Sequence, residues 1–241
     1  MKYYHDFVVR YQDTDDHQRL RLNLVEQYLL EAAGHVADEL GFGVKVLHPR
    51  NLGWILTHMS IEMDDIPTYL EHIRFETWIE SVAHKLTTRV YRIYRVASDG
   101  SLHEIGRCRS VWAVLDLTKR EIVDIYDEPM FDGSIDGEVL EMSRMPRLRM
   151  MPEVDFNRAD SVRYSDLDYN GHCNSCQYLL KMLDMARPDL EHPVRLDLIY
   201  TKEVHEGESI TLGVKRQEDG VQYQVVNSEN ELSAAAYVRT Y

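Results

Sequence analysis

The sequence predicts an α+β protein in which one helix followed by a series of antiparallel strands occurs twice. Three observations support this: a helical spacing of apolar residues over 22–40, several strand-like runs after it, and the same order again after residue 152. The chain has 241 residues, of which 44% are hydrophobic, so it can bury a sizeable core. Its length fits one large domain or two small ones.

The first helix is predicted over residues 22–40. Apolar side chains recur there at spacings of three and four residues, as on one face of a helix. They are Leu24, Val25, Tyr28, Leu29, Ala32, Val36 and Leu40. Gly41 follows directly and is a suitable end for this helix, because glycine readily adopts the left-handed conformation that closes many helices.

Four strand-like runs come next, at 54–63, 72–79, 86–96 and 107–117. In the third run, β-branched and aromatic residues alternate between two faces, which favours a strand. Asp99 and Gly100 lie between the third and fourth runs and form a typical turn sequence. These two runs are therefore predicted to form a hairpin of two long strands.

Residues 124–152 contain several prolines and glycines and no sustained period, which indicates a connection between two halves. A second helix is predicted over 174–185, and strands at 194–204, 209–216, 221–227 and 232–241. Each half thus consists of a strand, a helix and several more strands. We place an N-terminal domain at 1–135, a connecting segment at 136–152 and a C-terminal domain at 153–241.

The similar order of the halves is matched by a short internal repeat. Residues 10–15 read RYQDTD and residues 163–168 read RYSDLD, and four of the six positions are identical. Each segment lies just before a predicted helix. We interpret this as a duplication, which predicts two sheets that each wrap around a helix.

Composition excludes several classes of partner. The 27 Lys and Arg residues against 41 Asp and Glu residues give a net charge of -14, which disfavours nucleic acid and anionic membranes. No apolar run reaches membrane-spanning length, and the amino end lacks the pattern of a targeting signal, so a cytoplasmic protein is expected. Three cysteines are too few for a disulfide framework and are expected to be reduced.

The densest group of reactive side chains is the segment DLDYNGHCN at 166–174, where the second helix begins. A helix amino end can polarise a carbonyl oxygen that becomes negative during attack. The structural alternative is that Asp168, Asn170 and Asn174 only cap the helix and its preceding turn. Together with His172 the group exceeds what a cap needs, and the first half lacks the Asn-Gly-His element, so we favour a functional role in the second half.

Metal and cofactor sites are not expected. The eleven histidines show no metal-binding spacing, and no Gly-rich phosphate loop is present. Cys173 and Cys176 form a Cys-x-x-Cys pair, but no second pair completes a zinc site. The strand-rich order also differs from that of a thioredoxin, so both thiols are interpreted as packing residues.

At these residues the sequence resembles the acyl-ACP thioesterases, a family that carries two hotdog domains in one chain. The resemblance is strongest over 163–174 and extends to 198–203. In the first half the matching positions are Trp54, Ile55, Gly106, Arg107, Trp112, Asp116 and 118–120. It therefore covers nearly the whole chain and implies two tandem hotdog domains, each an antiparallel sheet wrapped around a central helix.

The resemblance implies a hydrolase of fatty acid biosynthesis that cleaves fatty acyl-ACP to free fatty acid and acyl carrier protein, without a cofactor. The family's catalytic positions fall on Asp168, Asn170, His172 and Glu203. Glu203, on a strand, would activate water or attack the carbonyl itself, and His172 would share protons. Asn170 and the helix amino end would bind the thioester oxygen, and Asp168 would orient the network. The first domain would hold the acyl chain, of unspecified length.

One departure from the family bears on mechanism. Some plant members carry a cysteine directly after the glutamate, and here that residue is Val204. A Cys-His mechanism through this position is therefore excluded, which favours a mechanism led by the carboxylate. An acyl-CoA thioesterase of the same fold remains an alternative, as do a dehydratase and a non-catalytic acyl-thioester binding module. Retention of all four catalytic positions speaks against the binding module.

The implied partner, acyl carrier protein, is itself acidic, so an acidic enzyme needs a local basic surface to bind it. The best basic run consists of Arg144, Arg147, Arg149 and Arg158. The alternative interpretation of this run is an ordinary solvated connector. Two hotdogs in one chain already resemble a dimer of single ones, so a monomer and a homodimer of chains both fit.

Overall fold

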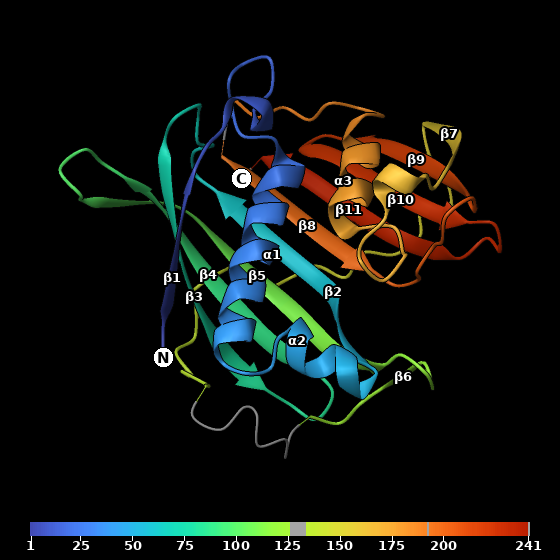
Figure 1. Cartoon of the computed structure of the whole chain (residues 1–241). Coiled ribbons are helices and arrows are strands. Elements are labelled where there is room, and N and C mark those ends of the chain that lie inside the picture. The colour runs from blue at the N-terminus through green and yellow to red at the C-terminus, as the bar shows by residue number, and fades with distance from the viewer. Residues whose placement is uncertain (126–133, 192, 241) are drawn as a thin grey trace. The chain divides into compact units, whose positions relative to one another are not determined.

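The computed structural model describes residues 1–125, 134–191 and 193–240 (Figure 1). The chain divides into two compact units, Met1–Ser143 and Arg144–Tyr241. Two predicted features fall partly outside the described residues: the irregular segment at 124–152, in its part 126–133, and the last strand, at Tyr241.

The first unit is an antiparallel sheet with the strand order β1-β3-β4-β5-β2. The bounds are β1 Tyr3–Val8, β2 Leu52–Met63, β3 His72–Val82, β4 Thr87–Val96 and β5 Leu102–Asp116, and a short β6, Glu121–Ile122, pairs with β5. The predicted hairpin is present as β4 and β5. Gly100 lies at its turn with φ +82°, where a residue without Cβ is favoured.

Helix α1, Leu22–Glu39, lies across one face of this sheet (Figure 1). Its apolar face is almost completely buried, and Leu29 and Ala32 are 0% exposed. Each fully buried leucine-sized side chain contributes about 1.5–3 kcal/mol, so packing rather than propensity holds this helix in place. Gly41 follows it with φ +80°, as the sequence predicted. A short helix α2, Val44–Leu47, was not predicted.

The second unit repeats this arrangement with the strand order β7-β9-β10-β11-β8. The bounds are β7 Phe156–Ser161, β8 Val194–Tyr200, β9 Ser209–Gln217, β10 Gly220–Asn227 and β11 Leu232–Thr240. Helix α3, Ser175–Leu183, packs on β9, β10 and β11. Position by position, the strand order matches that of the first unit, so the structure confirms the duplication inferred from the sequence.

The connection between the predicted domains is held down by hydrogen bonds rather than free. In the first unit, Trp78 donates from Nε1 to the Glu138 carbonyl at 2.8 Å, and the Leu140 N–H donates to Glu80 Oε1 at 2.8 Å. In the second unit, the Met151 N–H donates to Gln224 Oε1 at 2.7 Å. Between Glu138 and Met151 the backbone is therefore bound by side chains of the sheets and forms no helix or strand of its own.

Helix α3 carries a buried charge that faces two carboxylates. Lys181 Nζ lies 2.9 Å from Asp166 and 3.3 Å from Asp160, and its side chain is only 11% exposed. Burial opposes the charged form, but hydrogen bonds and charge from these carboxylates outweigh it and raise the pKa of Lys181. At the equivalent place in the first unit, Tyr28 donates its hydroxyl to Asp13 at 2.5 Å.

We expect Lys181→Ala to lower the free energy of unfolding by about 3 kcal/mol, because it leaves two shielded carboxylates without their cation. Lys202→Ala is the matched control in the same unit, since the Lys202–Glu231 pair is half exposed and a pair of that kind is worth at most about 1 kcal/mol. Urea unfolding measures both. Equal losses in the two variants would contradict the prediction.

In the part of the chain that the structure describes, no helix combines the length and the apolar character needed to cross a membrane.

Candidate active site

The loop before α3 is shaped by the carboxylate of Asp168. Its Oδ1 accepts the backbone N–H of Asn170 at 2.8 Å and that of His172 at 3.1 Å. The Asp168 N–H in turn donates to the His172 carbonyl at 2.8 Å, and Gly171 adopts φ +80° between them. Asp168 therefore fixes the backbone that carries Asn170 and His172.

The corresponding loop of the first unit has the same backbone hydrogen bonds but lacks the reactive side chains. Asp15 Oδ1 accepts the N–H groups of His17 and Arg19, both at 2.9 Å, and the Asp15 N–H donates to the Arg19 carbonyl. Gln18 stands at the position of Gly171 and adopts the same left-handed backbone conformation, with φ 64°. The loop shape is thus a property of the duplicated fold, and the position of His172 is what distinguishes the second copy.

Glu203 reaches this loop from beyond the end of β8, which corrects the predicted strand 194–204. Strand β8 ends at Tyr200 because the next two N–H groups, of Thr201 and Lys202, both point to the Ser233 carbonyl and the ladder register is lost. The chain then turns to the loop before α3, where the Cys173 N–H donates to the Val204 carbonyl at 2.9 Å.

This turn brings two predicted catalytic side chains together. His172 Nε2 lies 3.5 Å from Glu203 Oε2, and the two side chains are 15% and 28% exposed. This separation is that of an ion pair, and it is short enough for proton transfer once the pair tightens or one water bridges it. Both side chains are exposed enough to be reached by water or substrate. Both residues were predicted from the sequence. Their contact, however, depends on the backbone hydrogen bond between Cys173 and Val204, which are about thirty residues apart in the chain.

His205 is a neighbour of this pair that the sequence analysis did not single out. Residues 172 and 205 form an isolated antiparallel bridge, and the two imidazole rings meet edge to face with centroids 4.8 Å apart. The Glu208 carboxylate accepts the His205 N–H at 2.8 Å. The only signal in the sequence was the spacing of two from Glu203, which is too short to indicate a site.

The amino end of α3 lies after the loop. Asn174 is the N-cap, and its side-chain oxygen accepts the Cys176 N–H at 2.9 Å. The capping role considered for Asn174 is therefore confirmed, and the helix begins one residue later than predicted. Asn170 is half-buried in the loop itself.

The cysteines do not present a reactive thiolate. Cys108, Cys173 and Cys176 are all free and buried. Burial raises the pKa of the Cys173 thiol to about 12, so it stays protonated at neutral pH. This agrees with their interpretation as packing residues.

The four arginines of the predicted basic run are all exposed. Arg144, Arg147 and Arg149 lie in a segment without helix or strand, and residues 144–149 include no acidic side chain. Arg158 lies on the outer strand β7. Among the described residues, no ion pair engages these four guanidinium groups. They remain available to an acidic partner.

Comparison with sequence families decides the relationship. The family description of the acyl-ACP thioesterase N-terminal domain matches residues 1–131, and that of the C-terminal domain matches 151–239. The chain belongs to the acyl-ACP thioesterase family. The resemblance found in the sequence is thereby confirmed over both halves.

Curated members of the acyl-ACP thioesterase family show the same relationship at low identity. The oleoyl-acyl carrier protein thioesterase of Coriandrum sativum is 24% identical over 238 residues, which cover 90% of this chain. The palmitoyl-acyl carrier protein thioesterase of Arabidopsis thaliana is 29% identical over 170 residues. The matched regions span 59% and 39% of the lengths of these two proteins.

Solved structures confirm the fold. An acyl-ACP thioesterase from Bacteroides thetaiotaomicron superimposes with a TM-score of 0.84 at 26% identity, covering 99% of this chain and 97% of the other. The 12:0-ACP thioesterase of Umbellularia californica gives 0.83 at 17% identity, covering 99% and 96%. The tandem hotdog architecture expected from the sequence is therefore correct.

Proposed function

We propose that this acyl-ACP thioesterase family member hydrolyses a fatty acyl thioester carried by acyl carrier protein, and that the reaction takes place at the His172–Glu203 pair. Family membership supports the reaction class, and the 3.5 Å separation of imidazole and carboxylate is the observation that carries the assignment of the site. The first unit has Arg19 and Ile66 at the corresponding loop positions, so its copy lacks the pair.

In the hydrolysis, water oxygen forms a bond to the thioester carbon and the carbon–sulfur bond breaks. Glu203 takes a proton from the water as it attacks, and His172 gives one to the departing thiolate. The side-chain amide of Asn170 donates to the carbonyl oxygen as that oxygen becomes negative. Asp168 does not react in this scheme, because its hydrogen bonds go to the loop backbone.

Direct attack by Glu203 is the second route, and it passes through a mixed anhydride that water then opens. Turnover in ¹⁸O-labelled water identifies direct attack if the label appears in Glu203. Direct attack leaves the label in the Glu203 carboxylate after several turnovers when water opens the anhydride at the Glu203 carboxyl carbon, whereas water activation leaves that carboxylate unlabelled. Mass spectrometry of the peptide that contains Glu203 gives the answer.

The reaction itself is tested by thiol release from acyl-ACP and acyl-CoA substrates of several chain lengths. Faster turnover of the carrier-bound forms supports the proposal. Preference for acyl-CoA would favour the alternative carrier, and acyl binding without any thiol release would favour a binding module. Dehydration of a 3-hydroxyacyl substrate without thiol release would identify a dehydratase.

Docking of the acidic carrier is assigned to the basic run of Arg144, Arg147, Arg149 and Arg158. Its exposure and its lack of acidic neighbours along 144–149 support this role. Opposite charges at an interface mainly speed association and select the partner. We assign binding of the acyl chain to the first unit. The cytoplasmic location stays a prediction. Monomer and homodimer both stay open.

Reversing Arg147 and Arg149 to Glu is expected to raise KM for acyl-ACP several-fold while leaving KM for a small acyl thioester unchanged, because only the carrier meets this surface. Lys45→Glu with Lys85→Glu is the matched control, since it changes net charge equally at exposed sites of the first unit. Steady-state kinetics on both substrates measure the effect. A rise of equal size for the two substrates would remove the docking assignment.

A further inference from the structure

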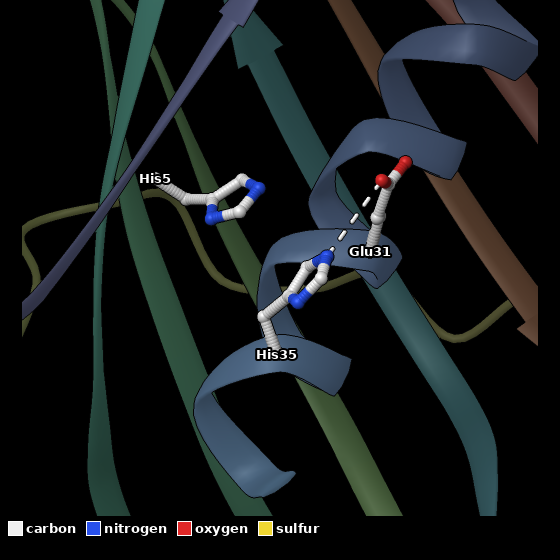
Figure 2. Close-up of side chains that lie close together, drawn as sticks. All are labelled: His5, Glu31 and His35. Carbon is white, nitrogen blue, oxygen red and sulfur yellow. Dashed lines mark ion pairs between the residues drawn. The ribbon is translucent and has the colours of Figure 1, made fainter. Parts of the chain in front are cut away.

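Three side chains with metal-binding atoms gather on the first unit, in a place that takes no part in the proposed reaction (Figure 2). His5 extends from β1, and Glu31 and His35 extend from α1. One ligand atom from each lies within 4.8 Å of the others. His35 Nε2 is 3.8 Å from Glu31 Oε1, and the two imidazole rings are stacked with centroids 4.6 Å apart.

The fold brings these residues together for simple geometric reasons. Glu31 and His35 are four residues apart and share one face of the helix. Strand β1 contacts α1, and Phe7 stacks on Tyr28 with ring centroids 4.6 Å apart. His5 is two residues from Phe7 on the same face of β1, and His35 is seven residues from Tyr28 on the same face of α1, so the second contact follows from the first.

We propose that His5, Glu31 and His35 form a binding site for a divalent transition metal ion of the zinc class, with water completing the coordination. Two imidazoles and one carboxylate suit zinc and its neighbours in the first transition row, whereas calcium and magnesium prefer oxygen ligands alone. Three protein ligands and one open position are a known zinc arrangement.

The distances allow a metal ion to be taken up by side-chain movement alone. Zinc lies about 2.0–2.1 Å from imidazole nitrogen, so tetrahedral ligand atoms stand roughly 3.3 Å apart. The side chains of His35 and Glu31 are 54% and 45% exposed and can rotate. His5 is half-buried and supplies the fixed ligand. Binding then replaces the stacked rings with two nitrogens that point at one ion.

The surroundings favour a cation. Carboxylates of Asp6 and Glu39 act on His5 in addition to that of Glu31. Asp6 is itself ion-paired with Arg74, so Glu31 and Glu39 are the carboxylates that add negative charge at the site.

The second unit cannot repeat this site. The spacing of 153 residues that relates β1 to β7 and the two loops places Arg158, Asp184 and Pro188 at the three positions. Helix α3 ends at Leu183, whereas α1 continues to Glu39 and so carries the second histidine. The site is thus a feature of the longer helix, where a bound ion would fasten the outer strand β1 to α1.

The test is isothermal titration of the chelator-treated full chain with zinc chloride, beside His35→Ala and Glu31→Gln. Both substitutions lie on the exposed helix surface and are compatible with folding, which circular dichroism verifies. We expect zinc affinity at this site to fall at least about tenfold in each variant, since even outer-shell partners of a metal are worth about 10- to 100-fold. Zinc should also raise the Tm of the wild type more than that of either variant.

His84→Ala is the matched control, because His84 is an exposed histidine of the same unit that pairs with the Asp124 carboxylate and does not belong to the proposed site. It should bind zinc like the wild type. None of these substitutions alters the His172–Glu203 pair, so any zinc bound there contributes equally to the titrations of the wild type and of all variants. Unchanged affinity, stoichiometry and zinc-dependent Tm in His35→Ala and Glu31→Gln would overturn the proposal, as would a wild type that binds no zinc.

Discussion

Replacing Glu203 with Gln is expected to lower kcat for acyl-ACP by about 10²- to 10⁴-fold, the range that loss of a general base produces. Gln has nearly the same size and keeps a polar side chain beside His172, but it cannot accept the proton of the attacking water. It cannot attack the carbonyl effectively either, so both routes fail. Binding of the acyl chain does not use this carboxylate, and KM should change little.

Rapid-quench measurement of thiol release gives this effect directly. Glu206→Gln is the matched control, because Glu206 is exposed, lies three residues away and has no role in the proposed reaction. It should retain wild-type kcat. A folded Glu203→Gln protein that turned over at the wild-type rate would refute the assignment of the site, while leaving family membership untouched.

The long elements of the fold could be predicted from the sequence because each carries its own pattern. The apolar face of α1 follows helical spacing over five turns, and the β4–β5 hairpin has alternation on both sides of a turn sequence. Strands β1 and β7 were expected before the helices but could not be delimited. Both are six-residue outer strands with little burial, so the period that identifies inner strands is weak in them.

The candidate site was predictable in its residues but not in its assembly. The short repeat placed His172 in a loop whose partner copy lacks it, which made the second half the functional one. Glu203 approaches His172 because the Cys173 N–H donates a hydrogen bond to the Val204 carbonyl. This bond can form only because β8 ends early, at Tyr200. Similarly, His5 and His35 are thirty residues apart and meet only through the packing of β1 on α1.

Asp168→Ala is expected to lower kcat by about 10²-fold or more, although Asp168 reacts with nothing in the proposed mechanism. Its Oδ1 accepts two backbone N–H groups, including that of His172. Without them the loop relaxes, and a misplacement of about 1 Å at reacting groups can cost about 10²-fold in rate. The free energy of unfolding should fall by about 1–3 kcal/mol, because charged hydrogen bonds are lost.

Two further variants separate positioning from proton transfer. Asp168→Asn keeps an acceptor oxygen, so it should recover most of the kcat lost in Asp168→Ala if the carboxylate only shapes the loop. Asp15→Ala removes the same pair of backbone bonds from the first unit, together with an ion pair to Arg19, so it should cost at least as much stability while leaving kcat near wild type. An inactive Asp168→Asn protein that is as stable as the wild type would show instead that the Asp168 carboxylate takes part in the chemistry.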